Sequence, residues 1–272
     1  MIPQYVITFR EAFEVLLLSV IIYGYLKKTG RGEYTRYLGY GVVGATITSL
    51  FLGLFAYTLY ITSEVKALFE IGGSFLAVGV LTYVVYTMAK SSREMIQSLK
   101  QRVENVQKMA LGVFIVGFVI AIREGIETIL FLIPFFGVDT IGNTVTGVIL
   151  GILSSIILAG LIYKMGINLD IRKFFLFTSI LIILIASGIL GYGIHELIEY
   201  MEENGFEVGT MGYYIYNLNI EKTNILHESN IVGGILSALI GYASKMELIR
   251  FIAQGGYLIL ALWLYLRVAL HK

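Results

Sequence analysis

Two short charged motifs interrupt hydrophobic segments of the chain. FREAFEVLLL occupies positions 9–18, and IREGIETILF occupies positions 122–131. Each contains the pattern R-E-x-x-E. On a helix, residues three or four apart share a face, so each arginine can pair with the second glutamate on the side that also carries the first. The charged residues of the two copies are Arg10, Glu11, Glu14, Arg123, Glu124 and Glu127.

Brought together, the two motifs would combine four carboxylates and two guanidinium groups, a formal charge of −2. Carboxylate oxygens are hard ligands that suit iron or manganese, and glutamates can also take up protons. The chain has no cysteine, which excludes thiolate sites and disulfides, and its eight methionines avoid the helix centres, which disfavours Cu(I). We therefore expect the four glutamates to bind a metal cation, with Arg10 and Arg123 setting the charge. The alternative is that the charges merely tie two helices together, although buried ion pairs seldom improve stability over apolar contacts.

The elements that position these motifs are expected to be membrane-spanning helices. The 272 residues are 57% hydrophobic and 14% charged, with a mean hydropathy of +0.80, which excludes a soluble enzyme. Uncharged runs reach the length of about 20 residues that a helical span requires. The charges of the two motif segments would argue against spans, but ionisable residues inside a membrane are functional by default. We therefore count both segments as spans. The expected spans are residues 4–26, 38–61, 67–89, 109–136, 141–163, 174–198 and 248–268.

The distribution of basic residues predicts the orientation. The connections after the first, third and fifth spans, together with the C-terminal tail, carry 14 basic residues. The opposite connections carry four basic residues and ten acidic ones. By the positive-inside rule, the N-terminus lies outside and the C-terminus lies in the cytoplasm. The net charge of +1 gives no reason to expect a nucleic-acid partner.

The doubled motif also predicts an internal repeat. Each copy opens a set of three helices, and because three is odd, the two sets cross the membrane in opposite directions. Such inverted repeats are typical of secondary transporters, whose binding site lies near the midplane between the repeats. The expected fold is an all-α integral membrane protein with seven transmembrane helices. It consists of a first three-helix repeat (1–108), a second (109–199), an outer acidic segment with a short apolar re-entrant or interfacial piece (200–247), and a seventh helix with a cytoplasmic tail (248–272).

Further polar residues fall near the outer ends of the spans. Glu70 opens the third helix and can line an entrance or mark a helix interface. His195 and Glu199 are four apart near the end of the sixth helix, with Glu196 beside them, and are candidates for an outer metal entrance. The segment lacks the second histidine of the zinc-protease pattern H-E-x-x-H. A second His-Glu pair follows at positions 227–228.

The motifs resemble the high-affinity iron permease family, the oxidase-linked iron transporters of fungi and their bacterial and archaeal relatives, whose signature is R-E-G-L-E. The second copy, REGIE at 123–127, differs by one conservative change, and the first, REAFE at 10–14, has Ala12 in place of glycine. GYGIHELIE at 191–199 and GILSALIGYASK at 234–245 extend the similarity over most of the chain. The resemblance implies an iron permease of the plasma (inner) membrane, multi-pass, whose four motif glutamates carry Fe³⁺ or Fe²⁺. It also implies an external oxidase or an iron-binding protein as partner, besides membrane lipid.

Two alternatives stay open. One is a permease for another divalent metal, such as lead or manganese. The other is a membrane carboxylate di-metal enzyme, although the chain lacks the doubled E-x-x-H that such sites use. We expect a transporter and not an enzyme. The residues leave open whether the ion is ferric or ferrous, what supplies the energy, and whether the chain forms a homo-oligomer.

Overall fold

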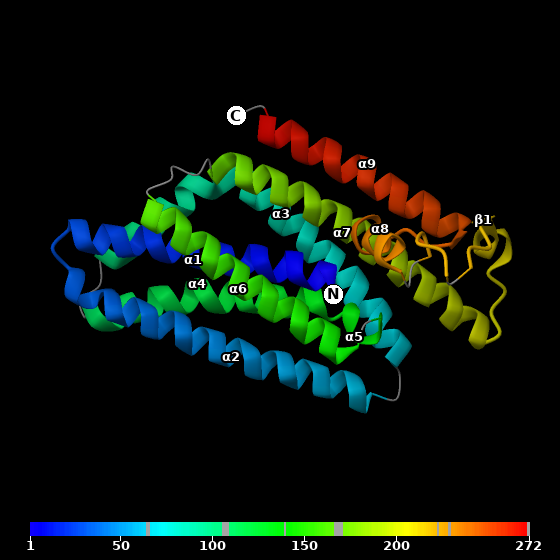
Figure 1. The fold of residues 1–272 in the computed structure, drawn as a ribbon, viewed down its shortest axis with the longest axis horizontal. Coiled ribbons are helices and arrows are strands. Elements are labelled where there is room, and N and C mark those ends of the chain that lie inside the picture. Colours follow the sequence, from blue (N-terminus) through cyan, green and yellow to red (C-terminus); the bar gives the residue numbers. More distant parts are fainter. Residues whose placement is uncertain are drawn as a thin grey trace.

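The computed structural model describes residues 1–63, 66–104, 109–138, 140–165, 171–221, 223–227 and 230–270. In this part of the chain, long helices lie side by side along the longest axis, with α2 at one edge and α9 at the other (Figure 1). The elements are α1 (Ile2–Lys28), η1 (Gly32–Tyr34), α2 (Thr35–Thr62), α3 (Lys66–Glu104), α4 (Met109–Leu132), α5 (Phe135–Val138), α6 (Ile141–Met165), α7 (Ile171–Glu203), η2 (Gly209–Gly212), β1 (Tyr214–Asn217), α8 (Ile231–Ile240), β2 (Lys245–Glu247) and α9 (Leu248–Leu270). Two short strands, β1 and β2, pair antiparallel at one end of the bundle.

The helices define a multi-pass membrane protein. Among the described residues, six helical segments are long and apolar enough to cross a membrane; they lie in α2, α3, α4, α6, α7 and α9. Helix α1 has 27 residues, which corresponds to about 40 Å, but three charges of the first motif lie in its first half. A charged residue at the centre of a span raises the apparent free energy of membrane insertion by about 2.5–3.5 kcal/mol. A hydropathy criterion therefore passes over α1 although its length suffices.

One expected helix is shorter than the sequence suggests. The fourth span, expected over 109–136, ends at Leu132, and the four-residue helix α5 follows after a turn. The cause is Pro134, which has no backbone N–H and disfavours helical geometry at the residue before it. The expected third helix, 67–89, is part of the longer α3. The short apolar piece expected within 200–247 is α8, whose ten residues reach about 15 Å and cannot span a bilayer.

The first half of the chain (α1, α2 and α3) makes its main helix contacts with the second half (α4, α6 and α7) and not within itself. We call these the exchanged contacts. The main neighbour of α1 is α6, the main neighbour of α4 is α2, and α3 packs on α7. The first helix of each set of three thus packs on the second helix of the other set, and the third helices pack on each other. Helix α9 has no counterpart in this scheme and lies along α7 and α3. As a result, α1 and α4 lie between other helices, while α2 and α6 expose most of their large apolar side chains.

Small residues allow the exchanged helices to approach closely. A Cβ atom added at Gly151 of α6 would lie 2.8 Å from the Phe9 backbone nitrogen and 2.9 Å from the Tyr5 carbonyl oxygen of α1. At the other contact, a Cβ atom on Gly41 of α2 would collide with the backbone of Phe114 in α4. Backbone atoms cannot move aside as a flexible side chain can, so only glycine fits at these crossings.

Gly151→Ala is expected to lower the stability of the purified protein by about 1–3 kcal/mol, because the added methyl group forces α1 and α6 apart. Gly160→Ala in the same helix is the matched control, since nothing lies within 4 Å of a Cβ there; it should be neutral or stabilising by up to about 1 kcal/mol. Thermal unfolding in detergent measures both. Equal unfolding temperatures for the two variants would contradict the close approach.

Candidate metal site

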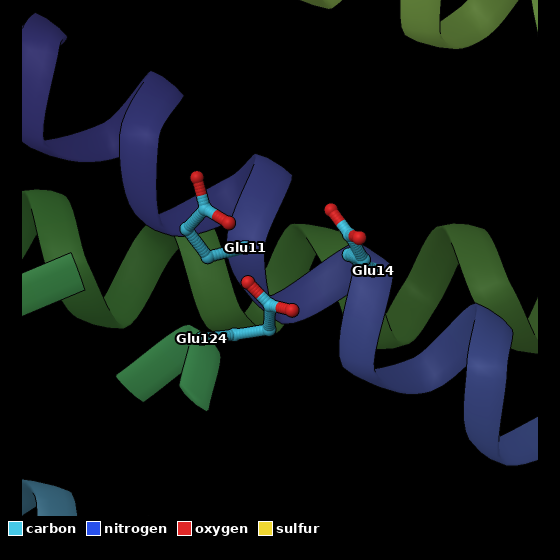
Figure 2. A group of neighbouring side chains, drawn as sticks. All are labelled: Glu11, Glu14 and Glu124. Atoms are coloured by element: carbon cyan, nitrogen blue, oxygen red, sulfur yellow. The ribbon is translucent and has the colours of Figure 1, made fainter. Parts of the chain in front are cut away.

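The structure brings together three of the four motif glutamates. Glu11 and Glu14 of α1 and Glu124 of α4 each offer an oxygen atom, and these atoms lie within 4.8 Å of one another. Figure 2 shows their side chains converging from the two helices. All three are buried, with relative exposures of 1%, 1% and 2%. We call these three residues the carboxylate triad.

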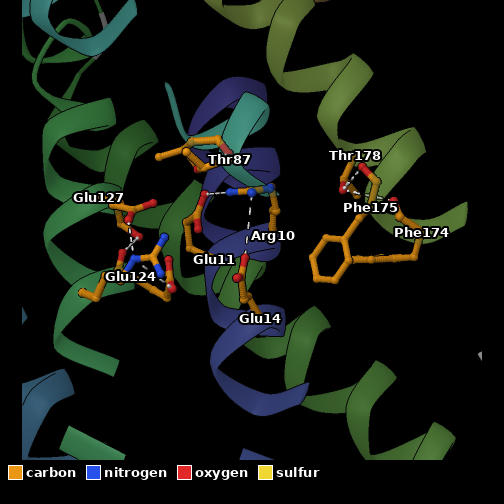
Figure 3. Close-up of polar contacts among 12 residues, drawn as sticks. Arg10, Glu11, Glu14, Thr87, Glu124, Glu127, Phe174, Phe175 and Thr178 are labelled. Atoms are coloured by element: carbon orange, nitrogen blue, oxygen red, sulfur yellow. Dashed lines mark hydrogen bonds and ion pairs between the residues drawn. The ribbon is translucent and has the colours of Figure 1, made fainter. Parts of the chain in front are cut away.

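The two arginines are placed differently. The Arg10 side chain is 1% exposed and pairs with Glu11 and, at 3.8 Å between Nη2 and Oε2, with Glu14. The Arg123 side chain is 44% exposed, and its Nε lies 2.9 Å from Oε1 of Glu127. Glu127 is thus held by an arginine beside the triad (Figure 3). The two motifs match in sequence, but only the first encloses its arginine completely.

The carboxylates retain capacity for a ligand. One oxygen each of Glu11, Glu14 and Glu127 is buried and accepts no hydrogen bond from any residue that the structure describes. The arginines supply counter-charge to these carboxylates, but a buried oxygen atom that accepts no hydrogen bond still costs free energy. A bound proton or a hard cation would satisfy these oxygens, and the ligand type is the one that iron and manganese accept.

A cavity of about 660 Å³ reaches the triad between α1, α2, α4 and α6. Glu11 and Glu124 line it, together with many apolar side chains of α2 and α6. Thr8, Ser49 and Ser155 are among its polar lining residues. The cavity therefore borders two of the three triad residues.

Glu70 lies apart from the triad in a cluster that the sequence did not reveal. Its Oε1 accepts a hydrogen bond from the Tyr60 hydroxyl at 2.6 Å, and its Oε2 accepts one from the Tyr192 hydroxyl. Tyr60 belongs to α2, Glu70 to α3 and Tyr192 to α7, so the cluster links three helices. Tyrosine is common in this chain, with 19 residues, and for that reason its type alone gave no signal.

The residues expected at the outer end of α7 separate in the structure. The Nδ1–H of His195 donates to Oε1 of Glu247 at 2.7 Å, while Glu199 is exposed. Glu196 lies near Tyr192. Within the described ranges, the triad alone forms a group of three His, Asp or Glu ligand atoms at metal-binding distances. His227 lines a polar pocket of about 650 Å³ with His195, and its neighbour Glu228 lies outside the described residues.

The Glu247 carboxyl in β2, which accepts the hydrogen bond from His195, is buried. Burial by itself would raise the pKa of the Glu247 carboxyl, but the hydrogen bond from His195 and the charge of Arg250, 3.9 Å away, outweigh it. The pKa therefore lies below its ordinary value of 4.5. A carboxyl with a lowered folded-state pKa stabilises the fold above its unfolded pKa, and this contribution is lost as the pH falls through the folded pKa.

Glu247→Gln is expected to cost about 1–2 kcal/mol of stability at neutral pH, because it removes a charged acceptor from His195. Below the ordinary carboxyl pKa the difference between the variant and the wild type should shrink. Thermal unfolding in detergent at pH 7 and at pH 4 measures this. A difference that stays constant with pH would mean that the charge of Glu247 contributes nothing.

Buried acidic residues that converge from two helices of a multi-pass membrane protein point to a membrane transporter for a cation. The sequence pattern of the Iron permease FTR1 family matches residues 1–268. The chain belongs to that family, as the motifs at 10–14 and 123–127 indicated.

Individual relatives agree with the family. An uncharacterized protein of Archaeoglobus fulgidus is 40% identical over 260 residues, which cover 95% of this chain and 92% of the relative. The ferrous iron permease EfeU of Yersinia pestis is 30% identical over 272 residues, or 97% of this chain and 93% of the relative. EfeU of Escherichia coli is 30% identical over 270 residues, 96% and 94% of the two chains. No solved structure matches the chain.

The family assignment decides between the classes considered from the sequence. Its members are iron permeases, so the chain is a multi-pass transporter of iron and not a carboxylate di-metal enzyme. Iron is the transported substrate and not a resident cofactor.

Proposed function

We propose that the chain moves iron across the plasma membrane into the cytoplasm through a midplane site made of Glu11, Glu14, Glu124 and Glu127. The observation that carries the proposal is the triad, in which buried carboxylates from both motifs face one another. Glu127 completes the site from beside the triad, and Arg10 and Arg123 keep the cluster from holding four uncompensated charges. The site then attracts a cation without binding it irreversibly.

The proposed mechanism is rocking of two inverted repeats, the three helices α1–α3 and the three helices α4, α6 and α7, around this site. The exchanged contacts support it, because a two-fold axis in the membrane plane would relate α1 on α6 to α4 on α2. A second sequence signal supports it as well. Residues 41–49 of α2 and 147–155 of α6, 106 positions apart, both read small residue, three residues, small residue, three residues, serine. In both, the serine is a lining residue of the cavity that borders Glu11 and Glu124.

The proposal includes seven spans, with α1 as the span that its charges conceal, and an N-terminus outside. Iron then approaches from the acidic outer side. Glu70, His195, Glu196 and Glu199 are the proposed outer entrance, now with Tyr60 and Tyr192 as neighbours of Glu70. An external oxidase or iron-binding protein would deliver the ion there, and lipid would cover the apolar faces of α2 and α6. The EfeU relatives are named for ferrous iron, which favours Fe²⁺ as the first ion to test.

The test is uptake of radioactive iron into proteoliposomes that contain the purified chain. Fe²⁺ with a reductant and Fe³⁺ as a citrate complex are compared, with manganese and lead as competitors. Single Glu→Gln changes at positions 11, 14, 124 and 127 follow, with folding checked by size-exclusion chromatography. Loss of uptake in all four variants is expected. Uptake at the wild-type rate in all four would make the carboxylates structural and overturn the four-glutamate site.

A further inference from the structure

Thr8 lies on α1 one turn before Glu11, on the same face of the helix. It is 3% exposed and lines the cavity that leads to the triad. Its Cβ packs against the position of Gly151 in α6. The side chain is therefore fixed in place by the close approach of α1 and α6, one helical turn from Glu11.

The Thr8 hydroxyl differs from other threonine hydroxyls in the described helices. Threonines at 46, 48, 58, 62, 82, 128, 146 and 178 donate to the carbonyl oxygen four residues earlier. Oγ1 of Thr8 is buried and has no hydrogen-bond partner among the residues that the structure describes. A helix always offers a threonine that carbonyl. A buried hydroxyl that leaves it unused is costly unless another group occupies the oxygen.

Shape alone does not account for the hydroxyl. Valine has the same branched outline as threonine and would fill the space against Gly151 equally well, without burying a polar group. The equivalent position of the second motif, 113 residues later, is Ala121, which also lines the cavity. One motif therefore presents an oxygen before its first glutamate, and the other presents a methyl group.

We propose that Oγ1 of Thr8 is a neutral ligand of the transported cation, which the ion contacts on the outer side of Glu11 and Glu124. This inference rests on the proposed iron pathway and adds a residue to it. Hard cations accept neutral oxygen donors beside carboxylates. The hydroxyl replaces one water molecule of the hydrated ion without adding charge, so the ion can shed water before it reaches the glutamates.

Three variants test the proposal. Thr8→Val removes the oxygen and keeps the shape, Thr8→Ser keeps the oxygen, and Thr48→Val is the matched control. Thr48 is exposed on α2, and its hydroxyl donates to the Gly44 carbonyl at 2.9 Å. We expect Thr8→Val to raise the KM for Fe²⁺ uptake about tenfold, the equivalent of about 1.4 kcal/mol, with little change in kcat. Thr8→Ser and Thr48→Val should keep the wild-type KM.

Binding is measured separately by anaerobic titration of the detergent-purified protein with Fe²⁺, where Thr8→Val should weaken binding by a similar factor. A Thr8→Val protein with wild-type KM and affinity and a higher unfolding temperature would overturn the inference, because the hydroxyl would then be only an unsatisfied group. Glu11→Gln and Glu124→Gln are run in parallel. If they lose uptake and Thr8→Val does not, the inference fails alone; if they transport normally, the proposed site fails.

Discussion

Arg10→Gln is expected to abolish iron uptake and to destabilise the protein by about 3–5 kcal/mol, the range for removal of one partner from a buried ion pair. The Arg10 side chain is fully enclosed, and without it Glu11 and Glu14 lose their common counter-charge. Arg123→Gln should cost about 1 kcal/mol or less and reduce uptake only in part, because the Arg123 side chain is nearly half exposed and exposed pairs contribute little. The two arginines occupy equivalent positions in the two motifs, but their side chains differ in burial.

The double variant Arg10→Gln/Glu14→Gln separates folding from transport. It removes one positive and one negative charge from the same face of α1, so much of the lost stability should return while uptake stays low. Thermal unfolding and proteoliposome uptake are measured on the same preparations. Arg10→Gln with normal stability and normal uptake would contradict the role of Arg10 as the enclosed counter-charge.

A disulfide that joins α3 to the end of α4 is expected to reduce the rate of iron uptake more than tenfold. A Cβ atom at Gly73 would lie 3.6 Å from the Cβ of Ile133, within the range of about 3.5–4.5 Å that disulfides require. The chain contains no cysteine, so Gly73→Cys/Ile133→Cys forms a single defined bridge. The bridge connects the two proposed repeats and should block their movement relative to each other.

Uptake is measured after oxidation and again after reduction with dithiothreitol, which should restore it. The two single-cysteine variants under the same treatments are the controls, and they should not respond to the oxidant. Full transport in the oxidised double variant, with the bridge confirmed by mass spectrometry, would show that α3 and α4 do not separate during the cycle. The rocking mechanism would then have to be abandoned for these helices.

Sequence patterns predicted the long helices well because charges mark their ends and apolar runs mark their lengths. The error at the fourth helix came from treating 109–136 as one run, although Pro134 breaks the backbone hydrogen bonding within it. The second small-residue signal, at 41–49 and 147–155, is offset by 106 positions and not by 113, since the connections within the two halves differ in length. A search at the spacing of the charged motifs passes over it.

The candidate site could be predicted only as far as local spacing reaches. Spacing placed Glu11 and Glu14 on one face, and the repeat suggested that Glu124 would meet them, as it does in the triad. Spacing could not separate Arg10 from Arg123, because their exposure depends on which helices lie beside α1 and α4. The pairing of His195 with Glu247 could not be predicted either, because 52 positions separate the two residues. Helical periodicity indicated only Glu199, four positions after His195.

The exchanged contacts of α1 and α6 have a consequence for how the chain is made. Helix α1 leaves the ribosome before α6, with Arg10, Glu11 and Glu14 unshielded, and its main neighbour α6 is synthesised more than a hundred residues later. A nascent helix with central charges inserts poorly by itself. We therefore expect stable insertion of α1 to depend on the second half, because neither half forms its closest helix contacts without the other. Two half-length chains should accumulate in the membrane only when a cell produces both.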